Sequence, residues 1–285
     1  MTSRFGMCEL FGMWCATPST VSLSFTELAQ HGGGTAHHTD GWGIAYHDGR
    51  DARLFREPSA AVHSPLARYL AEDGSTSSLV LAHVRKATMG ENFLVNTQPF
   101  LKDIGGRLHV FAHNGRFDDI ACKLPTPQRR AIGDTDSEQA FCVLVDELEK
   151  IWAQGTPSFA KRVAVVRDFA RRMCKMGPAN FLLTDGELLF AHANMRTQLD
   201  GSMAPPGMVM TERSCYQQHP DDEKVVRIHS QQTSTTQSTL AVTSSATEQH
   251  VVLFASVPLT DDEEWRPLDE GELVICHEGK VLHEF

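Results

Sequence analysis

The chain has 285 residues, of which 41% are hydrophobic and 22% are charged, and its formal net charge is −10. That length is enough for one large hydrophobic core or two small ones. The acidic balance argues against nucleic-acid binding, which normally needs a basic surface, and no apolar run reaches the roughly 18 residues of a membrane-spanning helix.

The first half of the chain is predicted to consist mainly of strands and hairpins. Residues 8–16 favour a strand, and residues 25–31 favour a short helix before the three-glycine turn at 32–34. A strand within residues 40–49 ends in an Asp-Gly turn and can pair with residues 52–58. Residues 64–72 favour a helix, and the apolar runs at 77–85 and 107–115 favour buried strands.

The second half begins with two helices and ends with strands. A capping pattern at residues 134–138 predicts a helix to about residue 150, and a second amphipathic helix spans 158–176. Hairpins are expected at 179–193 and at the C-terminal end, around Glu278-Gly279, after a strand at 250–256. Within 205–248 we expect a polar loop insertion, because residues 229–249 are rich in Ser, Thr and Gln. This order of elements indicates an α+β protein with antiparallel sheets.

The seven cysteines indicate a reducing compartment. Their number is odd and no C-x-x-C pair occurs, so they form neither a disulfide framework nor a zinc ribbon. The N-terminus does not resemble a secretory signal. We therefore expect a cytoplasmic protein. His37, His38 and Asp40 form a weak metal-binding pattern, since adjacent histidines rarely point the same way, and we expect no metal.

Four short motifs carry chemistry-bearing residues in the order Cys8, Arg85, Asn114 and Asp136. They are "MCELFG", "HVRKAT", "HNG" and "DTDSE". Each has a purely structural explanation: a buried strand cysteine, a charge at a strand end, a hairpin turn and a helix N-cap. Their occurrence together, and in this order, favours a functional explanation.

Taken together, the motifs resemble the class II glutamine amidotransferases, a branch of the N-terminal nucleophile hydrolases, in their stand-alone bacterial form. The stretches "HHTDGWGIA", "NTQPF", "NFLLTDG" and "FASVPLTDDE" extend the resemblance over most of the chain except about 205–248. It implies a four-layer αββα sandwich of two mainly antiparallel sheets flanked by helices. It also implies a single domain over residues 8–285, with residues 1–7 absent from the active form.

The resemblance implies that Cys8 is the nucleophile and the first residue of the working enzyme. A thiol is mostly protonated at neutral pH, with an unperturbed pKa of about 8.5, whereas the pKa of a free α-amine is about 7.7–8.0. The α-amine of Cys8 can then take the thiol proton, so no catalytic histidine is required. Asn114 and Gly115 would form the oxyanion hole through a side-chain amide and a backbone N–H.

The resemblance also implies the residues that bind the substrate, and their charges are complementary to those of glutamine. Arg85 offers a planar fork to the α-carboxylate of glutamine, Thr88 can add a hydrogen bond, and Asp136 can hold the ammonium group. The resemblance adds Gly115 to the substrate-binding residues. Lys86 and Met89 depart from the family's pattern, which has an aromatic residue and a histidine at these positions in many members. Because of these two departures, the sequence does not establish which amide-bearing substrate the protein uses.

The predicted reaction is hydrolysis of the γ-amide of glutamine, or of a γ-glutamyl compound, through a Cys8 thioester and without a cofactor. One alternative is a glutaminase subunit that delivers ammonia to a partner protein, and another is a non-catalytic binding or regulatory domain. Two explanations remain for the leader: Met7 is the true start, or residues 1–7 are a propeptide. No oligomeric state is predicted.

Overall fold

The computed structural model describes residues 8–23, 28, 40–86, 91–198, 200–216, 240–243, 248–260 and 263–285. Several predicted features lie outside these residues: the leader, nearly all of the helix at 25–31, the glycine turn at 32–34, and much of the polar insertion. Among single residues, His37, His38, Thr88 and Met89 also lie outside them.

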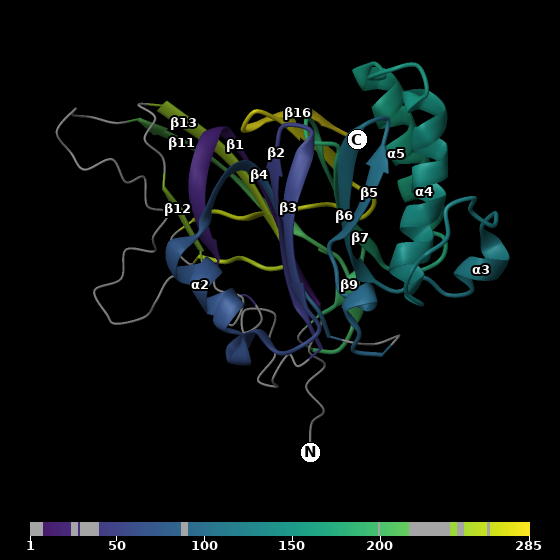
Figure 1. Cartoon of the computed structure of the whole chain (residues 1–285), viewed down its shortest axis with the longest axis horizontal. Helices are drawn as coiled ribbons and strands as arrows, with labels where there is room; N and C mark the ends of the chain where they lie inside the picture. Colours follow the sequence, from purple (N-terminus) through teal and green to yellow (C-terminus); the bar gives the residue numbers. More distant parts are fainter. Residues whose placement is uncertain are drawn as a thin grey trace.

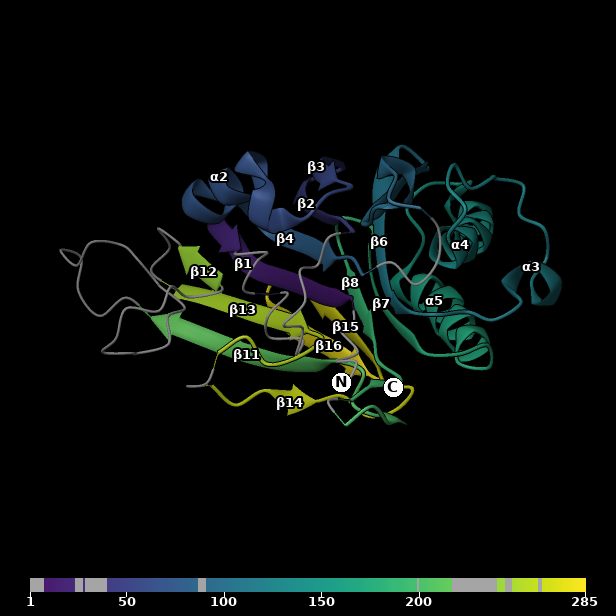
Figure 2. The same cartoon turned by 90° about the horizontal axis from the view of Figure 1, so that it is seen from below.

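The larger of two antiparallel sheets contains the strand that follows Cys8. Among the described residues its strand order is β14-β11-β13-β1-β4-β2-β3, and β12 pairs with the far part of β1 (Figures 1 and 2). Its strands are β1 (Glu9–Leu23), β2 (Trp42–Asp48), β3 (Asp51–Glu57), β4 (Ser75–Val84), β11 (Val209–Tyr216), β12 (Leu240–Thr243), β13 (Glu248–Ala255) and β14 (Arg266–Pro267). The site described below therefore begins in the middle of a sheet.

The second sheet contains the strand that carries the "HNG" motif. Its order is β16-β15-β8-β7-β6-β5, with antiparallel pairing throughout. Its strands are β5 (Phe100–Ile104), β6 (Arg107–Gly115), β7 (Ala179–Thr184), β8 (Leu189–His192), β15 (Leu273–His277) and β16 (Lys280–Glu284). A short ribbon pairs β9 (Arg196–Thr197) with β10 (Met203–Ala204).

Helices cover the outer faces of the two sheets. The described helices are η1 (Ala61–His63), α2 (Pro65–Asp73), η2 (Leu94–Asn96), α3 (Ile120–Lys123), α4 (Asp136–Trp152) and α5 (Phe159–Met173). Helices α4 and α5 lie side by side against the smaller sheet, and α2 lies against the larger one (Figures 1 and 2). The predicted four-layer α+β sandwich is confirmed.

Strand β1 shows how the alternating sequence builds two of the three core layers. Leu10 and Trp14 pack between the sheets, whereas Phe11 and Met13 pack in the layer beneath α2. Successive side chains of a strand point to opposite faces, so a strand buried on both faces needs an almost continuous apolar run. The third layer lies between the smaller sheet and helices α4 and α5.

Gly12 lets the two sheets approach each other closely near the start of β1. A Cβ atom at this position would lie 2.9 Å from Cδ1 of Leu182, which is fully buried on β7. Real Cβ atoms do not approach a carbon this closely, so a larger residue would force the buried Leu182 side chain to shift. The N-terminal end of β1 is thereby held near the end of β6.

Two details of the predicted strands were wrong. Strand β1 continues to Leu23 rather than ending near residue 16, with a register shift between Trp14 and Ser19. The buried side chain of Gln249 bonds the main-chain N–H and carbonyl of Thr17 at 3.1 and 2.9 Å, which carries the strand through its polar part. Strand β5 was not predicted, because its sequence "FLKDI" has only five residues and its apolar run is interrupted by Lys102 and Asp103.

We expect Phe111→Ala to destabilise the fold by about 3–5 kcal/mol, the usual cost of removing a buried phenylalanine. Phe111 is fully buried and its ring stacks on Phe141 at 5.0 Å. Urea denaturation measures the change. Ile132→Ala is the control, because Ile132 is 75% exposed and its loss should change the unfolding free energy by less than about 0.5 kcal/mol. Equal effects would contradict this packing.

Candidate active site

Cys8 lies directly before β1 and is half-buried. Its Sγ accepts a hydrogen bond from the main-chain N–H of Lys86 and donates one to the Lys86 carbonyl, both at 3.2 Å. The pairing of Glu9 with Val84 between β1 and β4 brings these residues together. The "MCELFG" and "HVRKAT" motifs therefore meet at one end of the larger sheet.

The Cys8 thiol is protonated at neutral pH when Cys8 is joined to Met7. Burial raises the pKa of Cys8 to about 11, and the carboxylate of Glu9 adds to this effect. The main-chain N–H of Lys86 and the charge of Arg85 lower the pKa but do not offset burial. Among the described residues, both hydrogen-bond partners of the sulfur are main-chain atoms of Lys86, so no side chain there acts as its base.

Asn114 connects the smaller sheet to the nucleophile's own residue. It is 3% exposed near the end of β6, and its Nδ2 donates to the carbonyl oxygen of Cys8 at 2.5 Å. The same Nδ2 lies 3.3 Å from Oγ of Ser256. On the main chain, the Asn114 carbonyl accepts a hydrogen bond from the side chain of Asn180 at 3.0 Å. Hydrogen bonds therefore hold both the side-chain NH₂ group and the main chain of Asn114.

Gly115 ends β6 with a backbone conformation that requires glycine. Its φ is +154°, and a Cβ atom there would lie only 2.0 Å from the carbonyl oxygen of Pro178. No other residue fits so close to a neighbouring main chain. The "HNG" motif thus turns beside the Asn114 amide and the Cys8 carbonyl.

Arg85 presents a buried guanidinium next to Lys86 and hence near the sulfur. The residue is 4% exposed, and its main-chain N–H donates to the carbonyl of Gly41 at 2.8 Å. Its Nη1 donates to the carbonyls of Asp40 and Glu91 at 3.3 Å and to Oδ1 of Asn92 at 3.1 Å. These loop oxygens orient a positive charge that a carboxylate could approach.

Asp136 is held at the start of α4 by main-chain donors. One carboxylate oxygen accepts from the N–H of Phe117 at 2.7 Å, and the other accepts from the N–H of Ser137 at 2.8 Å. Thr135, the N-cap residue, accepts from the N–H of Glu138. No hydrogen bond joins Asp136 to Cys8 or Asn114 in the described part of the chain. Asp136 is therefore connected to Cys8 and Asn114 only through other residues.

His113 is one of these connecting residues. Its Nδ1 lies 2.9 Å from Oγ of Ser137, and its ring stacks on Phe117 with ring centroids 4.2 Å apart. Burial lowers the pKa of His113, although the Asp136 carboxylate acts in the opposite direction. The imidazole is therefore neutral. Because His113 directly precedes Asn114, its contact with Ser137 links the start of α4 to the end of β6.

Three buried residues next to the predicted site were missed: Glu9, Arg196 and Ser256. Glu9 is fully buried, and its Oε1 lies 3.4 Å from Nη2 of Arg196. Burial raises the pKa of Glu9 to about 7, against the Arg196 charge and the Ser256 hydroxyl, which both lower it. A charged residue inside the apolar run "CELFGMW" was a usable signal, because a buried carboxylate needs partners.

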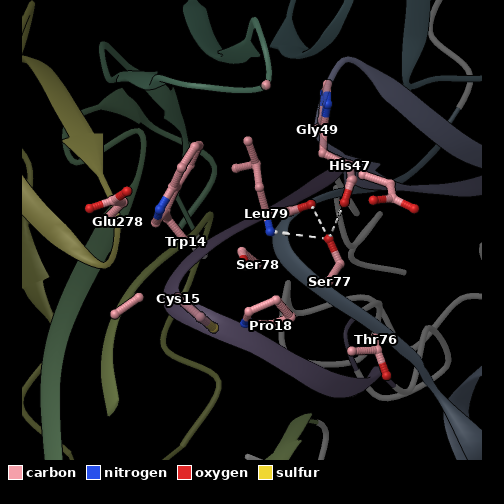
Figure 3. Close-up of a pocket in the computed structure, with 13 residues that line it drawn as sticks. Trp14, Cys15, Pro18, His47, Gly49, Thr76, Ser77, Ser78, Leu79 and Glu278 are labelled. Carbon is pink, nitrogen blue, oxygen red and sulfur yellow. Dashed lines mark hydrogen bonds between the residues drawn. The ribbon is translucent and has the colours of Figure 1, made fainter. Parts of the chain in front are cut away.

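A separate cavity of about 490 Å³ lies farther along β1 and contains none of the predicted site residues (Figure 3). Its lining includes Cys15 and His47. Burial raises the pKa of Cys15 to about 12 and lowers that of His47 to about 4. Both ring nitrogens of His47 are buried. Cys15 is therefore not an activated nucleophile, and His47 is not an accessible base.

The described residues contain no cluster of three or more side chains arranged to hold a metal ion. The same residues contain no helix with the length and apolar character needed to cross a bilayer. Of the candidate metal residues considered above, only Asp40 falls within the described ranges, where its carboxylate accepts a hydrogen bond from Asn92 at 2.9 Å.

Solved structures share this arrangement of sheets. A crystal structure of a predicted glutamine amidotransferase from Pseudomonas aeruginosa has a TM-score of 0.68 and 29% identity, covering 97% of this chain and all of that one. Glutamine phosphoribosylpyrophosphate amidotransferase from Bacillus subtilis has a TM-score of 0.54 and 14% identity, covering 98% of this chain and 49% of that one. The second likeness shows the fold alone.

Sequence comparisons agree with the structural ones. YafJ of Escherichia coli, assigned as a glutamine amidotransferase, is 33% identical and is aligned over 93% of this chain and 96% of its own length. A Haemophilus influenzae protein with the same assignment is 31% identical over 98% of this chain and 87% of its own. The family model described as glutamine amidotransferases class-II matches residues 7–285, and the chain belongs to this family.

Proposed function

We propose that the chain, with Cys8 as its first residue, hydrolyses the γ-amide of glutamine or of a γ-glutamyl compound. The hydrogen bond from Asn114 Nδ2 to the Cys8 carbonyl carries this proposal, because it joins an amide donor to the residue that bears the thiol. The Arg85 guanidinium stands one residue from Lys86, whose main chain holds the sulfur. A nucleophile, an oxyanion donor and a carboxylate receptor are thus close together.

A free α-amine on Cys8 would supply the missing base. With a pKa near 7.7–8.0, an α-amine can accept the thiol proton directly or through a water molecule. The family match begins at residue 7, which supports a working chain that starts at Cys8. Either a start at Met7 followed by methionine removal, or cleavage of a propeptide, would produce that end.

The reaction would proceed in two halves. The amine takes the thiol proton, and the sulfur bonds to the γ-carbonyl carbon, whose oxygen becomes an oxyanion. One Nδ2 proton of Asn114 moves its hydrogen bond from the Cys8 carbonyl to this oxyanion, and the N–H of Gly115 assists. The C–N bond then breaks, and the α-ammonium gives its proton to the leaving nitrogen. Water, deprotonated by the amine, next attacks the thioester and releases glutamate and the Cys8 thiol.

The other predicted residues would hold the amino-acid end of the substrate. Arg85 pairs with the α-carboxylate, with support from Thr88 and Gly115. Asp136 accepts from the α-ammonium group, since a carboxylate has about four acceptor sites and its two main-chain bonds leave some of them open. The cysteines with described side chains are free thiols, which supports our assignment of the protein to the cytoplasm.

Release of glutamate from glutamine or γ-glutamyl-p-nitroanilide should require a free N-terminal Cys8. We would compare a chain started at Met7, so that methionine removal exposes Cys8, with the full chain verified by intact mass. The first should be active, whereas the full chain and Cys8→Ala should not. Cys122→Ala, at an exposed cysteine, is the control and should keep full activity. An active Cys8→Ala variant would sink the proposal, and activity only with added cell extract would favour ammonia delivery to a partner.

The pH dependence of Cys8 alkylation should reveal the base. With Met7 attached, the rate with iodoacetamide should rise about tenfold per pH unit up to pH 11, following the raised pKa of the thiol. A chain that begins at Cys8 should react faster near pH 8, where its α-amine loses a proton. Peptide-resolved mass spectrometry measures both rates, with Cys122 in the same digest as a control. Identical profiles for Cys8 in the two chains would argue against an amine base.

Asn114→Ala should lower kcat by about 10²–10³-fold with a smaller change in KM, because it removes a donor used mainly in the transition state. Arg85→Lys should show the opposite pattern, a raised KM with a smaller effect on kcat, since it removes the fork that binds the ground-state carboxylate. Steady-state glutamate release separates the two. If Asn114→Ala raised KM and left kcat unchanged, an oxyanion role for Asn114 would be excluded.

A further inference from the structure

Ser256 directly follows β13 and meets both the start of β1 and the end of β6. It is 2% exposed, and its main-chain N–H donates to the carbonyl of Leu10 at 3.2 Å. Its Oγ accepts hydrogen bonds from the N–H of Leu10 at 3.0 Å and from Nδ2 of Asn114 at 3.3 Å. One hydroxyl therefore connects the two sheets next to Cys8.

The neighbours of Ser256 determine which way its hydroxyl faces. A serine hydroxyl has two acceptor lone pairs and one donor proton, and the N–H groups of Leu10 and Asn114 occupy the lone pairs. The proton is therefore directed away from Leu10 and Asn114, and the Ser256 hydroxyl lowers the pKa of Glu9. Arg196 fixes the rest of the arrangement, because its Nη1 donates to the Ser256 carbonyl at 2.5 Å and its Nη2 pairs with Glu9. Towards Asn114, Ser256 can only accept.

The orientation of the Asn114 amide matters because its oxygen and nitrogen have nearly the same shape. With the amide as placed, two donor protons face the Cys8 carbonyl and Ser256. With the amide turned over, its oxygen would face two acceptors and then a developing oxyanion. Each of these contacts would be repulsive.

We propose that Ser256 is a positioning residue that keeps the NH₂ group of Asn114, rather than its carbonyl oxygen, directed at the reacting centre. This inference rests on the proposed function. When an oxyanion replaces the Cys8 carbonyl as the partner of one Nδ2 proton, the bond to Ser256 continues to hold the amide in this orientation. Glu9 and Arg196 act through Ser256 by keeping its lone pairs turned towards Asn114 and Leu10.

The test compares Ser256→Ala with Ser256→Thr, which keeps the hydroxyl, and with Ser77→Ala as a matched control. Ser77 is 3% exposed on β4 and also bonds the main chain, but it lies in the cavity shown in Figure 3, away from Cys8. Thermal melting checks that each variant is folded. Ser256→Cys, which has nearly the same shape and a weak acceptor, replaces Ser256→Ala if that variant does not fold.

The first readout does not depend on activity. Hydrogen exchange of the Asn114 side-chain amide, followed by NMR and assigned with Asn114→Ala, should be about fivefold to tenfold faster in Ser256→Ala, the factor expected for one lost hydrogen bond. Ser256→Thr and Ser77→Ala should exchange at the wild-type rate. An unchanged rate in Ser256→Ala, or an equal increase in Ser77→Ala, would overturn the inference.

The second readout is steady-state glutamate release from the chain with a free Cys8. Ser256→Ala should lower kcat about tenfold to a hundredfold while KM stays within about twofold, because donor alignment acts in the transition state. Ser256→Thr should restore kcat, which a purely structural role of the site would not require. If the wild-type chain releases no glutamate, the proposed function fails, and amide exchange alone decides the role of Ser256.

Discussion

The close approach of the two sheets at Gly12 is the constraint on which the site depends. Cys8 leads into the larger sheet, whereas Asn114 is the last residue but one of β6 in the smaller sheet, and their contact spans the layer between them. Leu182 fills the space that a side chain at position 12 would occupy. Since packed interiors tolerate little change in volume, a larger residue there would force the buried Leu182 side chain, and the packing around it, to shift.

Local patterns in the chain predicted much of the fold. Helix α4 follows the capping pattern around Thr135, and strand β6 coincides with the apolar run at 107–115. The failures came from contacts between distant segments. Strand β1 continues through Thr17 because the side chain of Gln249, 232 residues away, bonds its main chain. Periodicity within a window of residues contains no information on such a partner.

The residues of the candidate site likewise fall into two groups: those that short motifs predicted and those that only contacts between distant segments reveal. Cys8, Arg85 and Asn114 stand in short motifs, and the structure places them close together. Glu9 and Arg196 are separated by 187 residues, so their pairing could not be inferred from spacing. Ser256 belongs to "FASVPLTDDE", a segment that resembles the family as a whole and gives the serine no individual role. Its two donors arrive from different sheets, and only the folded chain brings them together.

The distance along the chain between Leu10 and Ser256 has a consequence for synthesis. The two residues are 246 positions apart, a length that a ribosome takes roughly 10 to 50 s to add at about 5–20 residues per second. During this time the thiol near the N-terminus exists without the strand that completes its surroundings. Assembly of the site around the thiol therefore waits for one of the last strands to emerge.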